Sequence, residues 1–125
     1  MITIPEAVIS AWAERKGPVV LATVDSAGVP NAIYVTCVRE YDGNSIVIAD
    51  NYFNKTRANI QAGSSGSILF ITNAGKSYQL KGRIEYHTSG PVYDAMKTWN
   101  SDKHPGVAAA ALKVERVYCG GEQLV

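Results

Sequence analysis

The stretch "YDGNSIVIADNYFNKTRANI", residues 41–60, contains a turn, a strand and the start of a helix in direct succession. "DGN" is typical of a tight hairpin turn, and "SIVIAD" is an apolar run of the kind that forms strands. Asn54 is a favoured N-cap residue, so the unpaired N–H groups of the first helical turn fall at Lys55, Thr56 and Arg57. An ammonium, a hydroxyl and a guanidinium group therefore adjoin a helix start that attracts anions.

Two interpretations of this helix start are open at the level of local sequence. Either Lys55 and Thr56 hold a phosphate group, or they are solvated residues at the start of an ordinary surface helix. The preceding strand favours a phosphate, because residues 49–53 would present backbone groups and aromatic surface beside an anion at Lys55. That arrangement suits a nucleotide-like ligand.

Strand-forming runs lie on both sides of this stretch. "PVVLATVD" (18–25) ends in "DSAG" and "PNAIYVTCVREY" (30–41) ends in "DGN", so both runs predict hairpins, and "SIVIAD" completes a three-stranded meander. A short helix is predicted around residues 54–62, followed by the flexible break "GSSG". The strands "SILFITN" and "SYQLKGRIEYHT" then form another hairpin around the turn "AGK".

Three further segments complete the predicted fold. Residues 5–17 predict an amphipathic N-terminal helix, and residues 89–102 predict a helix that packs on the barrel. In "GVAAAALKVERVYC" (106–119) we interpret the alanines as a transition and the end as a strand. The 125 residues are expected to form one domain, residues 1–125, of mainly β class: an antiparallel, closed or partly closed β-barrel of five to seven strands with short helices.

Composition argues against several classes of function. Twelve basic and eleven acidic residues give a formal net charge of +1, which supplies no strong field for nucleic acid or an anionic membrane. Cys37, Cys119, His87 and His104 are too isolated for a metal site or a disulfide framework. "MITIPEAVIS" lacks a basic leader and a long apolar run, so we expect a cytoplasmic protein without a signal peptide or a spanning helix.

The second strand predicts an oligomer. Neither of its two faces is clearly polar: one carries Ala32, Tyr34, Thr36 and Val38, and the other carries Ile33, Val35 and Cys37. Both faces are therefore expected to be covered. A chain of this length has little else with which to cover the outside of a barrel, so we expect a homodimer that shelters a ligand at its interface.

The run "VVLATVDSAGVPN…YDGNSIVIADNYFNKTRANI", followed by "YQLKGRIEYHTSGPVYDAM", resembles the FMN-binding split β-barrel family. This family includes pyridoxamine 5'-phosphate oxidase and small bacterial FMN-binding proteins, and the similarity is closest to the latter. The resemblance extends from about residue 17 to residue 99, with "DGN", "KT", "AN" and "GP" in the family's order. It implies a split barrel that binds FMN at the interface of a homodimer.

The resemblance also implies the residues that bind the cofactor. Lys55 and Thr56 would bind the FMN phosphate, and Asn54 would approach it. The end of the preceding strand would supply backbone hydrogen bonds to the flavin and ribityl chain, the second strand would form the opposite wall, and the neighbouring subunit would contribute from the long strand after the helix. The strand end comprises Ala49, Asp50 and Asn51, and the opposite wall comprises Ala32, Ile33, Tyr34 and Val35. The neighbouring subunit would contribute Ser77 and Gln79. Tyr34 and Tyr52 either stack near the flavin or are ordinary aromatic residues of the barrel and its loops.

The resemblance implies an FMN-dependent oxidoreductase or electron-transfer flavoprotein, with a redox protein or a nicotinamide donor as a further partner. The oxidase's Arg-x-His motif is missing from the end "VYCGGEQLV", and its second-strand arginine is missing unless Arg57 or Arg83 replaces it. Oxidase activity on pyridoxamine 5'-phosphate is therefore not expected, and no catalytic residue is assigned. A non-catalytic module that binds a flavin, a deazaflavin or haem, and an interaction barrel without a cofactor, are the alternatives.

Overall fold

The computed structural model describes residues 2–125, so Met1, the first residue of the predicted domain, lies outside the described residues. The helices are α1 (Glu6–Ala13), α2 (Lys55–Gln61) and α3 (Pro91–Trp99). The strands are β1 (Val19–Val24), β2 (Pro30–Val35), β3 (Val38–Tyr41), β4 (Ser45–Asp50), β5 (Ser65–Ile71), β6 (Ser77–His87), β7 (Ala108–Cys119) and β8 (Glu122–Gln123).

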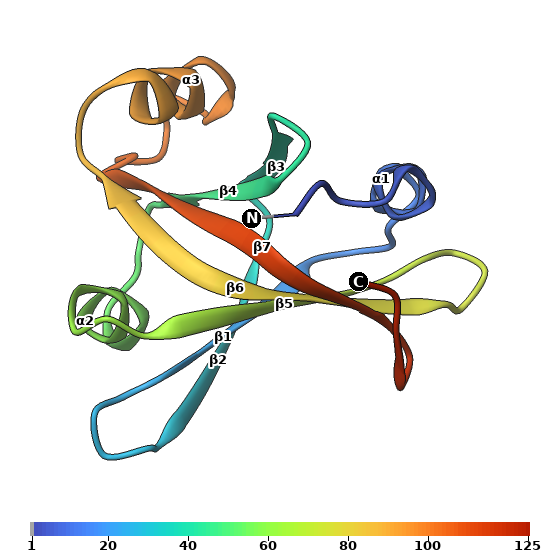
Figure 1. Cartoon of the computed structure of the whole chain (residues 1–125). Helices are drawn as coiled ribbons and strands as arrows, with labels where there is room; N and C mark the ends of the chain where they lie inside the picture. The colour runs from blue at the N-terminus through green and yellow to red at the C-terminus, as the bar shows by residue number, and fades with distance from the viewer. Residues whose placement is uncertain (1) are drawn as a thin grey trace.

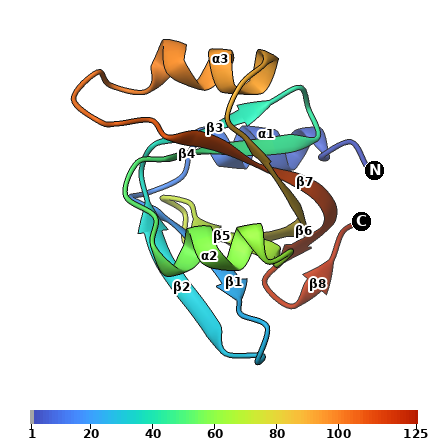
Figure 2. The same ribbon diagram turned by 90° about the vertical axis from the view of Figure 1, so that its left-hand side faces the viewer.

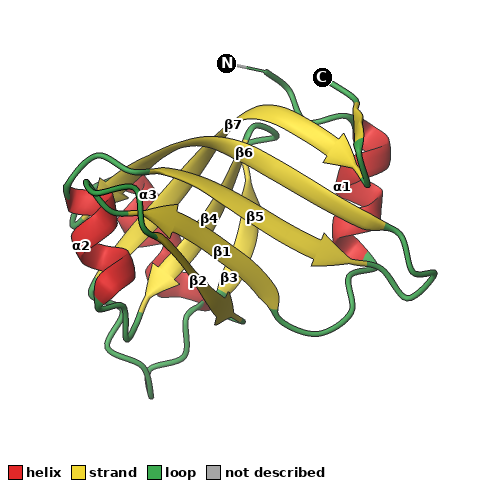
Figure 3. Ribbon diagram, turned by 90° about the horizontal axis from the view of Figure 1, so that it is seen from below, coloured by secondary structure: helices red, strands yellow, loops and turns green. Residues whose placement is uncertain are grey.

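All of these strands belong to one antiparallel sheet. Its order is β2-β1-β5-β6-β7-β4-β3, and β8 pairs with the end of β7. The sheet is strongly curved, and its two longest strands, β6 and β7, run across it side by side (Figures 1 and 3). The predicted mainly β, antiparallel split barrel with short helices is therefore confirmed, as a curled half-barrel. The predicted number of five to seven strands was too low, because residues 30–41 form two strands and the short β8 is added.

Residues 30–41 form two strands rather than one. β2 pairs with β1, whereas β3 pairs with β4 at the other end of the sheet order. Both predicted hairpins are present, but the three-stranded meander was wrong. In one continuous strand Val35 and Val38 would face opposite sides of the sheet, because successive residues alternate. The break at Thr36 and Cys37 allows both side chains to enter the main core.

The four alanines at positions 108–111 are strand residues, so the prediction of a transition there was wrong. They pair with β4 on one side of β7, and three of them pair with β6 on the other. All four are buried, and Ala109 and Ala111 pack with Met96 of α3. A helix that lies close against a central strand requires small side chains, and this packing outweighs the helix propensity of alanine.

A β-bulge interrupts the pairing of β6 with β7. The register shifts between Lys81 and Gly82, and a Cβ atom on Gly82 would lie 1.8 Å from the carbonyl oxygen of Lys113. Only glycine fits this close backbone approach. Because a bulge bends its strand, this one contributes to the curvature of the sheet.

The other predicted elements are present, with several changes of boundary. The N-terminal helix, predicted over residues 5–17, ends at Ala13, and the helix predicted over residues 89–102 covers Pro91–Trp99. Ser65 and Gly66 of the expected flexible break "GSSG" are the first residues of β5. α1 packs Val8 and Trp12 into the main core, and α2 contacts β1, β2 and β6 (Figure 2). Among residues 2–125, no helix is both long enough and apolar enough to cross a membrane.

Candidate functional site

A cavity of about 290 Å³ lies between β2 and the end of β4. β2 and its connection to β3 form one wall, the end of β4 and the following turn form the second, and the loop after α3 contributes one residue. The lining residues are Ile33, Tyr34, Val35, Thr36, Cys37, Ala49, Asn51, Tyr52, Phe53 and His104. Five of the predicted site residues are thus brought together, namely Ile33, Tyr34, Val35, Ala49 and Asn51.

Asn51 fastens the loop after α3 to the cavity. Its side-chain amide exchanges two hydrogen bonds with that of Asn100, at 3.1 and 2.9 Å, and its Oδ1 also accepts from the backbone N–H of Gly106 at 3.0 Å. The backbone N–H of Val107 donates to the carbonyl oxygen of Asp50 at 2.8 Å. The loop that carries His104 is therefore tied at both of its ends.

Tyr52 and His104 form a pair at the cavity. The Tyr52 hydroxyl lies 3.1 Å from Nδ1 of His104, and the two rings meet edge to face with their centroids 5.7 Å apart. Tyr52 is largely exposed and His104 is half-buried. Both side chains can therefore touch an occupant of the cavity and solvent.

Asp50 is the last residue of β4, and its carboxylate is fully buried beside the turn that leads to α2. Its Oδ1 accepts from the backbone N–H of Phe53 at 3.0 Å and from Nη2 of Arg57 at 2.9 Å. Its Oδ2 accepts from Nε of Arg57 at 2.7 Å and from the Tyr86 hydroxyl. Both oxygens are used, so this carboxylate holds the turn, α2 and β6 together.

These contacts also affect proton affinities. Hydrogen bonding to Asp50 raises the pKa of Arg57 above its ordinary value, so this guanidinium stays charged and paired. Burial, followed by the hydrogen bond to Asp50, raises the pKa of Tyr86. Tyr86 therefore acts as a neutral donor to the carboxylate.

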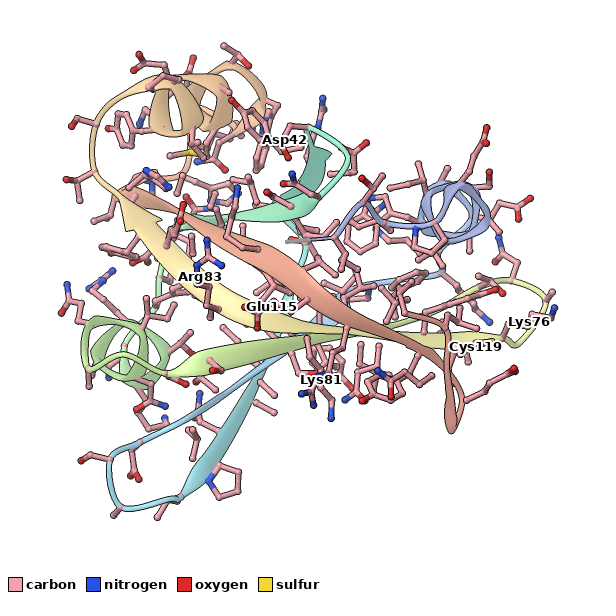
Figure 4. The ribbon with its side chains drawn as sticks, viewed as in Figure 1. Asp42, Lys76, Lys81, Arg83, Glu115 and Cys119 are labelled. Carbon is pink, nitrogen blue, oxygen red and sulfur yellow. The ribbon has the colours of Figure 1, made fainter. Side chains whose placement is uncertain are left out.

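Neither arginine considered as a replacement for the family's second-strand arginine is free. Arg57 pairs with Asp50, and Arg83 lies 3.5 Å from Glu85 and 3.6 Å from Glu115. Figure 4 shows Arg83 and Glu115 together on β6 and β7. Lys55 is the exposed cation at the start of α2.

The start of α2 adjoins the same strand as the cavity. Thr56 is only 1% exposed, and its hydroxyl oxygen accepts from Nδ2 of Asn31 at 3.0 Å. Asn31 precedes the cavity residue Ile33 by two positions on β2, on the same side of the strand. Asn54 stands at the N-cap, as predicted, but its side chain makes no capping hydrogen bond. Asp50 accepts from the backbone of the turn instead, through the N–H of Phe53.

The remaining predicted residues lie outside the cavity. Ala32 is exposed on the opposite face of β2, and the buried Asp50 lies behind the cavity wall. Ser77 and Gln79 lie near the start of β6, and β1 and β5 separate them from β2. Gln79 lines a second hollow, of about 400 Å³, on the outer face of the sheet. The contribution of Ser77 and Gln79 from a neighbouring subunit remains a prediction.

Sequence reasoning missed several residues of the site. His104 was considered only as a metal ligand, and Asn31, Thr36 and Cys37 were not assigned to the site. Phe53 fell within the segment 49–53 expected beside the ligand but was given no role of its own. Thr36, Cys37 and Phe53 directly continue predicted wall segments, so extending those segments would have found them. His104 gave no such signal, because it is 52 positions from its partner Tyr52. Among residues 2–125, no three His, Cys, Asp or Glu side chains lie close enough to hold a metal ion.

Comparison with known protein families shows the family to which this chain belongs. The model of the family described as pyridoxamine 5'-phosphate oxidase matches residues 5–119, which include both cavity walls and the start of α2. The chain belongs to the pyridoxamine 5'-phosphate oxidase family. An uncharacterized protein of Methanocaldococcus jannaschii, MJ0282, is 27% identical over 105 residues, which are 80% of this chain and 70% of that protein.

Solved structures of similar fold differ in their named ligands. HupZ of Group A Streptococcus is 25% identical, covers 93% of both chains and superposes with a TM-score of 0.81. An FMN-binding protein of Syntrophomonas wolfei has a TM-score of 0.72 at 17% identity, over 81% of this chain and 75% of its own. A heme binding protein of Mycobacterium smegmatis has a TM-score of 0.74 at 20% identity, over 94% of this chain and 55% of its own. The family fold is thus shared by proteins with different cofactors.

Proposed function

We propose that the protein binds FMN, with the flavin ring in the cavity between β2 and β4 and the phosphate at Lys55 and Thr56. The observation that carries this proposal is the continuity of the two parts. β2 lines the cavity with Ile33 and Val35 and contacts Thr56 through Asn31. One strand therefore borders both an apolar slot and a charged helix start, which are the two parts that a flavin phosphate ester requires.

The phosphate would meet one ammonium group, one hydroxyl and free backbone donors. The Thr56 oxygen already accepts from Asn31, so its own proton is available to a phosphate oxygen. Lys55 supplies the positive charge, and the first turn of α2 supplies unpaired N–H groups. Arg57 takes no part, because Asp50 holds it.

The ring would lie against the side chains of Ile33, Val35 and Phe53, which exclude water from one of its faces. Bound FMN would supply hydride or single-electron chemistry, with a nicotinamide donor or a redox protein as the source of electrons. The residues of this chain would bind and orient the ring and limit access to it. Cytoplasmic location is part of the same proposal.

A homodimer would complete the site. Tyr34, Val20, Leu69 and Gln79 lie in one row across β2, β1, β5 and β6 on the outer face of the sheet. Tyr34 is 77% exposed and Leu69 is 44% exposed, and Ile71 near by is 46% exposed. Apolar groups gathered on one sheet face are typical of an interface. A second copy on this face would bring Ser77 of the partner subunit and Gln79 of the partner subunit towards the ligand.

The first test is the absorption spectrum of the purified protein, followed by titration with FMN and with riboflavin, which lacks the phosphate. We expect a flavin spectrum and a preference for FMN over riboflavin. Lys55→Gln should weaken FMN binding by about tenfold or more, the size of a charged hydrogen bond, and leave riboflavin binding unchanged.

The control is Lys76→Gln, in the turn at the opposite end of the sheet from α2 (Figure 4). It should bind both flavins as the wild type does. A protein that binds neither flavin would contradict the proposal, and equal affinities for the two would refute the phosphate anchor.

Haem is the second candidate, and His104 favours it. His104 would be the residue that holds the iron, through the ring nitrogen that Tyr52 does not contact, as a second hydrogen-bond partner is common among metal-binding histidines. A non-catalytic flavin or deazaflavin module is the remaining alternative. The same spectrum separates haem from flavin and deazaflavin, and turnover with a nicotinamide donor separates an enzyme from a binding module.

A further inference from the structure

The second hollow, of about 400 Å³ on the outer face of the sheet, shares no lining residue with the flavin cavity. β1, β5, β6 and β7 all contribute to its lining. Four of its lining residues carry a small side chain or none, namely Ala22, Gly66, Ser67 and Gly82. These small residues leave room on the sheet surface, and the volume lies within the range of pockets that hold small molecules.

Two cations face each other at this hollow. Lys81 of β6 is paired directly opposite Arg116 of β7, and both side chains are exposed and line the hollow. Like charges directly opposite each other on a sheet are destabilising. Within the described range 2–125, neither cation forms an ion pair with a carboxylate. The Lys81 ammonium lies 5.1 Å from the centroid of the Tyr118 ring, a contact that does not neutralise its charge.

The neighbouring arginine, in contrast, has acidic partners. Arg83, two positions further along β6, lies 3.5 Å from Glu85 and 3.6 Å from Glu115 (Figure 4). Glu115 also lines the hollow, but Arg83 already offsets its charge. The positive charge of Lys81 and Arg116 is therefore not balanced by this carboxylate.

A hydroxyl without a partner lies in the same row. Ser67 of β5 is paired directly opposite Lys81 on one side and Ala22 of β1 on the other. Gly66 and Ile68 on either side of it are buried, so alternation places Ser67 on the outer face. Its Oγ atom is screened from solvent and makes no hydrogen bond within residues 2–125. Such a group is costly, and an acceptor oxygen in the hollow would satisfy it.

We propose that this hollow binds the phosphate group of a small molecule, with Lys81 and Arg116 supplying positive charge and Ser67 a hydrogen bond. A dianion between the two cations would replace their mutual repulsion by attraction to a shared counter-charge. A guanidinium donates two parallel hydrogen bonds to a phosphate, and an ammonium acts on it as a point charge. The remaining volume has room for a small organic group attached to the phosphate.

The inference does not rest on the proposed function, because it uses neither the flavin cavity nor the start of α2. The hollow adjoins the row from Tyr34 to Gln79 that the proposed homodimer would cover, and Gln79 belongs to both. A bound anion would also lower the cost of placing two like charges beside that interface.

Two-dimensional NMR of the isotope-labelled protein separates this site from the proposed phosphate anchor at α2. Inorganic phosphate, glycerol 3-phosphate and glycerol would be titrated at constant pH and ionic strength. The backbone amide signals of Ser67, Lys81 and Arg116 report on the hollow, and those of Lys55 and Thr56 report on α2. We expect both phosphates, but not glycerol, to shift the signals of the hollow. Tighter binding of glycerol 3-phosphate would identify an ester as the ligand, and tighter binding of inorganic phosphate would identify the free anion.

Substitutions test the role of each group. Lys81→Gln and Arg116→Gln should each weaken phosphate binding at the hollow by about tenfold, the size of a charged hydrogen bond. Ser67→Ala should weaken it several-fold without lowering the melting temperature, because the hydroxyl has no partner in the free protein. The control is Lys76→Gln, which removes the same charge in the turn between β5 and β6, outside the hollow.

Signals of the hollow that respond to neither phosphate would overturn the site. An affinity that Lys81→Gln and Arg116→Gln leave at the level of Lys76→Gln would overturn the assignment of these cations. Shifts confined to Lys55 and Thr56 would support the phosphate anchor and refute the outer-face site, and shifts confined to the hollow would do the reverse. The two proposals therefore fail separately.

Discussion

At the scale of single residues, Asp50 has the greatest structural importance in the site. It accepts four hydrogen bonds from a backbone amide, a guanidinium and a phenol while it is fully buried. The sequence predicted Asp50 as a backbone contact of the ligand. The structure shows that its side chain builds the turn from which Lys55 and Thr56 follow.

This role predicts that Tyr86→Phe lowers the free energy of unfolding by about 1–2 kcal/mol, because the carboxylate loses one hydrogen bond. Asp50→Asn should be more destabilising, since it also removes the charge that Arg57 faces. Urea unfolding measures both. The control is Arg83→Gln, whose ion pairs are exposed and should contribute less than about 1 kcal/mol. A Tyr86→Phe protein as stable as the wild type would contradict the role of this hydrogen bond.

The sequence identified site residues whose neighbours in space are also close in the sequence, and it missed contacts between residues that are far apart in the sequence. Lys55 and Thr56 could be recognised because their neighbours, a strand end and a helix start, are adjacent in the sequence. The contact of Asp50 with Tyr86 spans 36 positions, and that of Asn31 with Thr56 spans 25. Asn31 and Thr56 join β2 to α2, and Asp50 and Tyr86 lie on β4 and β6, which β7 separates. Such contacts are created by tertiary packing, which the local pattern of one sequence does not specify.

At the scale of elements, the bulge at Gly82 shapes β6 and β7. It predicts that Gly82→Ala is destabilising by about 3 kcal/mol, because the new methyl group would collide with the backbone of Lys113. Gly121→Ala is the matched control, since nothing lies within 4 Å of its added Cβ atom. Thermal unfolding of the two variants measures the difference, and equal stabilities would refute the steric account.

The alternating patterns predicted most strands correctly. They failed at two segments, where tertiary packing rather than the local pattern determines the secondary structure. The alanines at 108–111 have helical propensity but form a strand, because they pair with β4 and β6 and pack against α3. Residues 30–41 read as one strand and form two, because Val35 and Val38 must both reach the core. In both cases the deciding contact comes from an element distant in the sequence.

At the scale of the whole molecule, the proposed homodimer makes the outer face of the sheet the surface to test. If the proposed homodimer covers the row that contains Tyr34 and Leu69, then Leu69→Asp should convert dimers to monomers, because it would bury an unpaired charge. It should also weaken FMN binding, since the site would lose the partner's wall. Light scattering coupled to size-exclusion chromatography measures the mass.

Val29→Asp is the matched control for this change. Val29 is 57% exposed in the turn between β1 and β2, outside that row. This variant should keep the wild-type mass and FMN affinity. A monomeric wild type, or a Leu69→Asp protein that stays dimeric, would contradict the assignment of this face.

The position of β7 in the sheet has a consequence for synthesis of the protein. β7 lies between β6 and β4 in the sheet but follows both in the sequence. The pairing of Asp50 with Ala108 can therefore form only after most of the chain has been synthesised. Until then β4 and β6 each lack the partner strand on one edge, and such unpaired edges are prone to pair with other chains. Such non-local pairing is slow, so we expect folding to be completed late in translation and to be the step most exposed to aggregation.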